Sequence, residues 1–159
     1  MTHESNASRG EQPTLARHQQ SVRFDQLDYT YPGTKSPALE GIDLDIPFGQ
    51  VVAIVGGNGS GKSTLVAALT RLVAPDAGRV LIDGQDINTH DLRSVRAQMA
   101  MVTQKTKLFK GTIAENIAYG RAWARREDVA AAAKAATADL FIDEMPGGYD
   151  TPIGEGGEG

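Results

Sequence analysis

The residue types and spacing best suited to chemistry lie in one glycine-rich run: Gly56, Gly57, Asn58, Gly59, Ser60, Gly61, Lys62, Ser63 and Thr64. The order Gly, four residues, Gly-Lys-Ser is that of a phosphate-binding loop. Glycines permit positive φ and carry no Cβ, so successive backbone N–H groups can point at phosphate oxygens. A helix beginning near Lys62 adds the partial positive charge of its N-terminus. We expect Lys62 to reach the β and γ phosphates and the Ser63 hydroxyl to bind Mg²⁺; the alternative is a glycine-rich turn that binds nothing.

This loop needs a strand before it and a helix after it. Val51 to Val55 is apolar on both faces and mostly β-branched, which is typical of a central strand of a parallel sheet covered by helices. Residues 62–72 predict a helix, with Leu65, Ala68, Leu69 and Leu72 on one face.

The rest of the chain predicts short elements. Residues 22–31 alternate as a strand with one slip between Phe24 and Leu27, and a second alternating stretch follows at 39–46. Further elements are expected as strands at 79–82 and 99–102 and as helices at 91–97, 112–118 and 125–136. Residues 1–20 are polar and aperiodic, which predicts a disordered tail or linker.

Composition narrows the function. The chain has 159 residues, which suits one domain, and a net charge of -4, which gives no bulk attraction to nucleic acid. It has no cysteine and only three scattered histidines, so cysteine-ligated zinc is excluded. No apolar run approaches the roughly 18 to 20 residues that cross a bilayer, so we expect any membrane role to come through a partner.

From Val22 to Gly159 the sequence resembles the ATP-binding-cassette (ABC) domains of exporters. The resemblance implies an α/β fold, the P-loop NTPase core of an ABC ATPase, with an N-terminal antiparallel β part and the start of a helical subdomain, incomplete at its end. Residues 21–159 would be the N-terminal portion of such a domain, with ATP and Mg²⁺ as ligands. Tyr31, before Pro32-Gly33, matches the family's A-loop aromatic that stacks on adenine. The alternatives are a half-buried strand aromatic at Tyr31, or Tyr29 in its place.

A second matching region begins at Gln104. Val102-Thr103-Gln104 and the residues after it are similar to the family's Q-loop, in which Gln104 would bind Mg²⁺ or the attacking water. The alternative is an exposed loop glutamine. The surface around Phe109 would meet a transmembrane domain, and residues 148–155 resemble the loop that leads into the family's signature sequence.

The signature Leu-Ser-Gly-Gly-Gln and the Walker B strand do not occur in the sequence. In the family, the Walker B strand carries an Asp that orients Mg²⁺ and is followed by a catalytic Glu. Leu140 to Glu144 ends in such an Asp-Glu pair, but only three apolar residues precede the pair, so we interpret the segment as a helix end with exposed carboxylates. No catalytic residue is therefore assigned. We expect the isolated chain to be poorly folded and not to hydrolyse ATP, because Val51 to Val55 would lack parallel neighbours.

Three functions remain to be compared. The first is ATP binding within an ABC exporter at the cytoplasmic face of a membrane, with a second ABC domain and a transmembrane domain as partners. The second is a non-catalytic nucleotide-binding or dimerising module. A small P-loop kinase or GTPase is disfavoured, because the Asn-Lys-x-Asp guanine motif is absent and a strand pair precedes the loop.

Overall fold

The computed structural model describes residues 12–104, 107–121 and 123–154. The chain divides into two compact units, Met1–Met101 and Val102–Gly159, and we describe each by itself. The phosphate loop and Tyr31 belong to the first unit, whereas Gln104 and Phe109 belong to the second.

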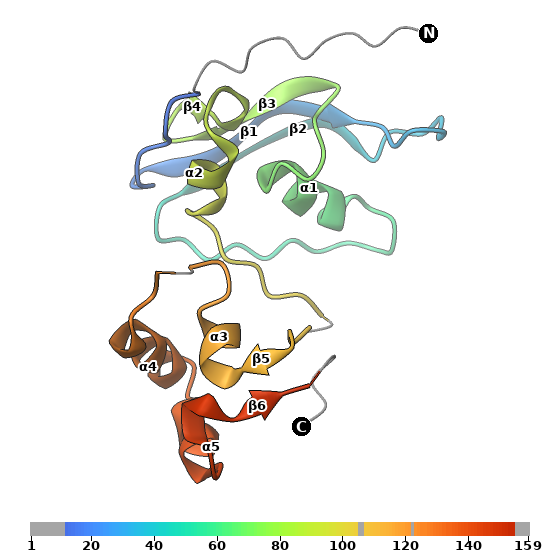
Figure 1. Ribbon diagram of the computed structural model, residues 1–159. Helices are drawn as coiled ribbons and strands as arrows, with labels where there is room; N and C mark the ends of the chain where they lie inside the picture. Colours follow the sequence, from blue (N-terminus) through green and yellow to red (C-terminus); the bar gives the residue numbers. More distant parts are fainter. Residues whose placement is uncertain (1–11, 105–106, 122, 155–159) are drawn as a thin grey trace, which may run out of the picture. The chain divides into compact units, whose positions relative to one another are not determined.

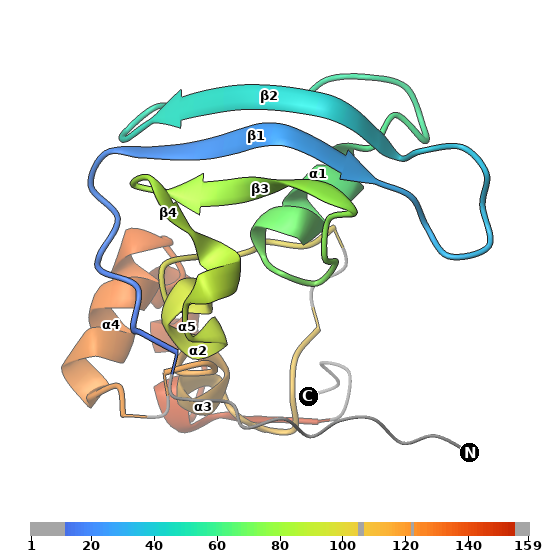
Figure 2. The same ribbon diagram turned by 90° about the horizontal axis from the view of Figure 1, so that it is seen from above.

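The first unit is built on a four-stranded antiparallel sheet (Figure 2). Its strands are β1 (Ser21–Tyr29), β2 (Leu39–Pro47), β3 (Ala77–Ile82) and β4 (Gln85–Asp86), in the order β2-β1-β3-β4. Every neighbouring pair is antiparallel. The expected antiparallel β part is therefore confirmed.

Strand β1 is irregular at the place where the alternation slips. The register against β2 shifts between Phe24 and Leu27, and Gln26 has a φ of 48°. The Gln26 carbonyl lies so close to Gly78 of β3 that a Cβ at Gly78 would overlap it. This bulge, which needs a glycine opposite, turns both Phe24 and Leu27 inward, where they are 2% and 0% exposed.

Two helices cover one face of this sheet (Figure 1). They are α1 (Lys62–Leu69) and α2 (Leu92–Arg96), and the short 3₁₀ turn η1 (Ile87–Thr89) precedes α2. The buried core joins the sheet to both helices through Phe24, Leu27, Tyr29, Leu39, Leu65, Ala68, Val80, Ile82, Ile87 and Val95. Helix α1 ends before Leu72, which is exposed, because Arg71 adopts a φ of 53° and turns the chain away.

No strand forms at Val51 to Val55, so this sequence prediction is wrong. The run is irregular, and Val51 and Val55 are fully exposed or nearly so. A strand requires hydrogen-bonded neighbours, and no described residue pairs with this run in either sheet. For the same reason Met99 to Val102 forms no strand.

Residues 12–20, which we call the strap, lie along the first unit in place of the expected disordered tail. Leu15 of the strap is 3% exposed and belongs to the core. The carboxylate of Asp83, in the β3–β4 turn, accepts hydrogen bonds from the His18 ring and from the backbone N–H groups of Gln19, Gln20 and Ser21 at 2.7–2.9 Å. Residues 1–11 lie outside the described residues.

The second unit is smaller and mostly helical. It contains β5 (Gly111–Thr112), α3 (Ile113–Ile117), α4 (Arg126–Ala135), α5 (Asp139–Glu144), the 3₁₀ turn η2 (Gly148–Asp150) and β6 (Pro152–Ile153). Strands β5 and β6 pair antiparallel, and Ile113, Ala133 and Ile142 form the core. Thr112 and Glu115 form a capping box that starts α3.

Leu140 to Glu144 lies in helix α5, and both Asp143 and Glu144 are exposed. The sequence prediction of a helix end with exposed carboxylates is therefore confirmed. Because the Asp-Glu pair lies at the end of an exposed helix, no strand among the described residues orients its two carboxylates.

Asp83 ties the strap to the sheet, and its ionisation reports on that attachment. Its side chain is 11% exposed, and burial alone raises its pKa. The N–H donors of Gln20, Gln19 and Ser21 and the His18 ring act in the opposite direction and hold the pKa at about 2, below the usual 3.8.

A carboxyl whose pKa is depressed on folding stabilises the fold above its unfolded pKa and loses this contribution as the pH falls through its folded pKa. We therefore expect Asp83→Asn to lower the free energy of unfolding by about 2 kcal/mol at pH 7, and the difference from wild type to shrink between pH 4 and 2. Urea titrations followed by circular dichroism measure this. Asp45→Asn, an exposed carboxylate of β2, is the control; equal losses in both variants would contradict the assignment.

Candidate functional site

The start of helix α1 presents unpaired backbone donors. The first N–H groups of any α-helix have no partner within the helix. At α1 the N-cap is Gly61, with a φ of 84°, and it provides no side-chain hydrogen bond. The N–H groups of the first turn therefore remain available to an anion, as a phosphate loop requires.

Two glycines of the loop lie close to other parts of the chain. A Cβ at Gly61 would overlap the carbonyl oxygen of Ala38 and approach the Leu39 side chain to 3.0 Å. A Cβ at Gly56 would meet the Ser60 Oγ at 2.6 Å. The overlap at Gly61 is with backbone, so this position requires glycine, whereas the Ser60 hydroxyl beside Gly56 can rotate away.

Lys62 lies back over the loop that precedes it. Its ammonium donates to the carbonyl oxygens of Gly56 and Gly57 at 2.9 and 2.7 Å, and it lies 3.4 Å from the Ser60 Oγ. The positive charge is thus held at the mouth of the loop, beside the free N–H groups. Both features favour a negatively charged ligand.

Tyr31 lies against the same helix. Its hydroxyl lies 3.1 Å from the Oγ1 of Thr64, which is 5% exposed, and its ring packs edge-on against Tyr29 at 5.0 Å. Tyr29 is 9% exposed and belongs to the core, whereas Tyr31 is 43% exposed. Of the two tyrosines that the sequence left open, only Tyr31 offers a ring surface for stacking.

Tyr31 and the loop share a cleft of about 570 Å³. Its lining includes Tyr31 and Gly59, Ser60, Gly61, Lys62, Ser63 and Thr64, so the structure brings together most of the predicted site residues of the first unit. Gly56, Gly57 and Asn58 lie in the preceding turn of the loop and are exposed.

The cleft also contains residues that the sequence analysis missed. Thr34, Lys35, Ser36, Pro37 and Ala38 line it from the connection between β1 and β2. The Thr34 hydroxyl donates to the Tyr31 carbonyl at 2.8 Å and fixes this connection. The Pro32-Gly33 turn was a signal for them, because antiparallel pairing of β1 and β2 returns the chain past Tyr31.

Gln104 is exposed and belongs to the second unit. Its role as a Mg²⁺ ligand stays a prediction. No group of three or more His, Cys, Asp or Glu side chains gathers in the part of the chain that the structure describes. Ser63, whose hydroxyl is the other predicted Mg²⁺ ligand, lines the cleft.

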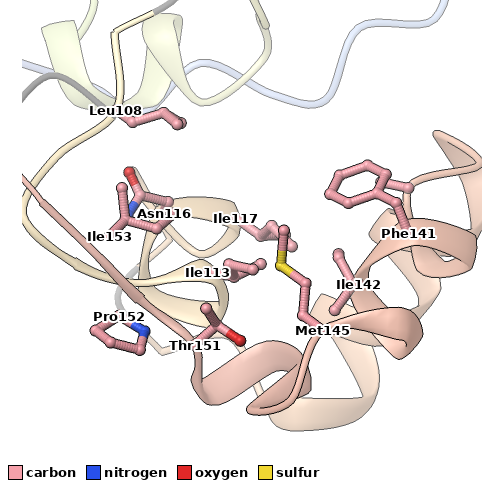
Figure 3. Close-up of a pocket in the computed structure, with 11 residues that line it drawn as sticks. Leu108, Ile113, Asn116, Ile117, Phe141, Ile142, Met145, Thr151, Pro152 and Ile153 are labelled. Atoms are coloured by element: carbon pink, nitrogen blue, oxygen red, sulfur yellow. The ribbon is translucent and has the colours of Figure 1, made fainter. Parts of the chain in front are cut away.

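The second unit carries an apolar pocket of about 300 Å³ (Figure 3). Figure 3 shows Phe141 and Met145 on one side of it and Ile113 and Ile117 on another. Next in sequence to Leu108, which lines this pocket, the exposed ring of Phe109 stacks on Tyr119 at 4.1 Å. The Asn116 amide holds the backbone of Phe109 through two hydrogen bonds of 2.7 and 2.9 Å.

A glycine loop at the head of a helix, beside an exposed tyrosine, places the first unit in the class of P-loop nucleotide-binding folds. The family model described as ABC transporter matches residues 39–153. The chain therefore belongs to the ABC transporter family, and it corresponds to part of an exporter-type ATP-binding domain.

Relatives agree with this assignment. An ATP-dependent lipid A-core flippase of Chromobacterium violaceum is 48% identical over 136 residues, which cover 86% of this chain and 23% of that protein. The protein of the same name in Nitrosococcus oceani is 47% identical over 152 residues, with 95% and 25% covered. A solved bacterial Atm1-family ABC exporter with ATP bound superimposes with a TM-score of 0.82 at 45% identity, over 91% of this chain and 25% of that one.

The chain thus spans about a quarter of the length of these relatives. Among the described residues, no helix is both long enough and apolar enough to cross a bilayer.

Gly61 and Gly57 allow a matched test, because an added Cβ would overlap backbone at Gly61 but not at Gly57. Gly61→Ala forces a positive φ on alanine and overlaps the Ala38 carbonyl, so we expect a loss of about 2 kcal/mol or more in the free energy of unfolding. Gly57→Ala meets nothing within 4 Å, and we expect a change within about 0.5 kcal/mol. Urea denaturation of both variants measures the difference, and equal losses would show that the close approach is not required.

Proposed function

We propose that the chain binds ATP with Mg²⁺ in the cleft of the first unit, as part of an ABC exporter that couples ATP binding and hydrolysis to transmembrane transport. The observation that carries the proposal is the shared cleft of about 570 Å³, which joins an exposed aromatic ring to the free N–H groups of a helix. Its lining also contains two lysines, Lys35 and Lys62, and no carboxylate, so it suits an anion.

Each part of the ligand has a partner in this arrangement. The ring of Tyr31 stacks on adenine, an interaction worth about 1 to 3 kcal/mol. The N–H groups of the loop and of the first turn of α1 bind the phosphate oxygens, and Lys62 exchanges its carbonyl partners for the β and γ phosphates. The hydroxyl of Ser63 would hold Mg²⁺, and the Gln104 amide oxygen, in the second unit, is by its chemistry also suited to bind Mg²⁺. Bound Mg²⁺ neutralises charge on the phosphates.

The transport role needs partners. Relatives named as lipid A-core flippases and the Atm1-family exporter support a second ABC domain and a transmembrane domain as partners, at the cytoplasmic face of a membrane. We propose that the transmembrane domain docks around Phe109, because this ring is 46% exposed and the preceding residue, Leu108, lines the apolar pocket. The Asn116 amide would hold Phe109 in position for this contact.

Nucleotides with one, two or three phosphates separate the contribution of the base to affinity from that of the phosphates. We expect Tyr31→Ala to weaken ATP, ADP and AMP by a similar factor, about 5- to 100-fold, because stacking involves only the base. Lys62→Met should weaken ATP far more than AMP. Tyr31→Phe keeps the ring and loses only the contact with Thr64, so it is the matched control.

Isothermal titration calorimetry of the three nucleotides measures these affinities. A Tyr31→Ala variant that binds all three as wild type does would remove Tyr31 from the adenine site. Retained ATP affinity in Lys62→Met would argue against the phosphate loop as the binding site.

We expect residues 1–159 alone to show no Mg²⁺-dependent ATP turnover. Hydrolysis needs a carboxylate that activates water beside the γ-phosphate, and the cleft lining contains none. The Asp-Glu pair in α5 is exposed on a helix of the second unit. A phosphate-release assay tests this, with Lys62→Met as the background control. Turnover above that background would contradict the expectation, whereas binding without turnover also fits a non-catalytic nucleotide-binding module.

A further inference from the structure

The strap and the phosphate loop are connected by an unbroken series of contacts within the first unit. The first contacts join the strap to α2. The Asp91 N–H donates to the Pro13 carbonyl at 2.9 Å, the Leu15 N–H donates to the Ser94 hydroxyl at 2.9 Å, and the His18 N–H donates to the Gln98 side chain at 3.2 Å.

The side chain of Leu15 reinforces this docking. It is 3% exposed and packs in the same buried cluster as Val95 of α2, which is 0% exposed. The Ser94 hydroxyl, which accepts from the strap, also donates to the Asp91 carbonyl at 2.7 Å. The strap therefore stabilises the short helix α2 at its N-terminal end and along its buried face.

Helix α2 is in turn attached to the C-terminal end of α1. The Arg96 guanidinium donates to the carbonyl oxygens of Thr70 and Arg71 at 3.1 and 3.2 Å. Arg71 reaches back to the His90 carbonyl at 2.8 Å. A cation that satisfies the last carbonyls of a helix also complements the negative end of its dipole.

The two hydrogen bonds from Arg96 to the end of α1 are called the clamp below. Helix α1 has eight residues, so about 12 Å separate the clamp from the phosphate loop at the other end. The run before the loop, residues 51–57, forms no strand that would fix the direction of α1. The orientation of α1 thus depends on its buried residues Thr64, Leu65 and Ala68 and on the clamp at its C-terminus.

We propose that the strap positions the phosphate loop through Arg96, so that docking of the strap and binding of nucleotide stabilise each other. The proposal rests on the proposed function, because it assumes that a nucleotide binds at the start of α1. Arg96 is a positioning residue here, since it touches α1 and not the ligand. Thermodynamic linkage requires that whatever releases the strap weakens nucleotide binding by the same factor that nucleotide stabilises the strap.

The test uses the whole protein and measures two quantities: the affinity for Mg²⁺-ATP by titration calorimetry, and the hydrogen exchange of the strap amides with and without Mg²⁺-ATP. In wild type we expect nucleotide to slow exchange at the N–H groups of Leu15 and His18. We expect Leu15→Ala and Arg96→Gln each to lower ATP affinity about fivefold or more and to abolish this slowing.

Arg93→Gln is the matched control. Arg93 is an exposed arginine on the same helix, and its side chain makes no hydrogen bond or ion pair within the described residues. Should Arg96→Gln fail to fold, Arg96→Lys keeps the charge but loses the two-point contact, and Ser94→Ala removes one strap contact. We expect partial loss of affinity and of protection from each.

The outcomes separate the two proposals. If wild type does not bind ATP, the proposed function fails. If wild type binds ATP but nucleotide leaves strap exchange unchanged, or if Leu15→Ala and Arg96→Gln bind ATP as Arg93→Gln does, the coupling is overturned while ATP binding stands.

Discussion

The backbone of the first unit passes close to itself where Gly61 meets the carbonyl of Ala38, and the candidate site depends on that approach. Because no Cβ separates the two segments, the β1–β2 connection lies directly beside the head of α1. Tyr31 therefore reaches Thr64, and Lys35 faces the same cleft as Lys62. An exposed aromatic ring and a glycine-rich loop are thus brought together from two short segments of the chain.

Helix α1, which starts at the phosphate loop, is too short to be rigidly oriented by its own length. Two turns of helix bury only a few side chains, here mainly Leu65 and Ala68, so their hydrophobic contribution is limited. Polar contacts at the far end of α1, from Arg96, supply the directional restraint that apolar packing lacks. The unit thus uses non-directional burial to hold the helix on the sheet and directional hydrogen bonds to aim it.

What the sequence could predict was local in character. The helix that starts at Lys62 and the bulge after Phe24 depend on neighbouring residues, and both were visible in spacing alone. The strand at Val51 to Val55 was wrong because strands depend on partners far along the chain. The strap was missed because a single buried side chain, Leu15, and a carboxylate collecting backbone N–H groups leave no mark on composition. The lining residues Thr34 to Ala38 were missed because only the hairpin pairing carries them to the loop.

Binding of a nucleotide and its hydrolysis require different arrangements of charged groups. An anion is held by N–H groups, a helix dipole and lysines, all of which nine consecutive residues and one nearby turn can provide. Activation of water requires a carboxylate that stays ionised close to a triphosphate, where like charges repel and only rigid, separately anchored elements can hold it. The described cleft concentrates positive charge and lacks such a carboxylate. The positive charge that lines the described cleft therefore suits the binding of an anion, a requirement separate from the activation of water.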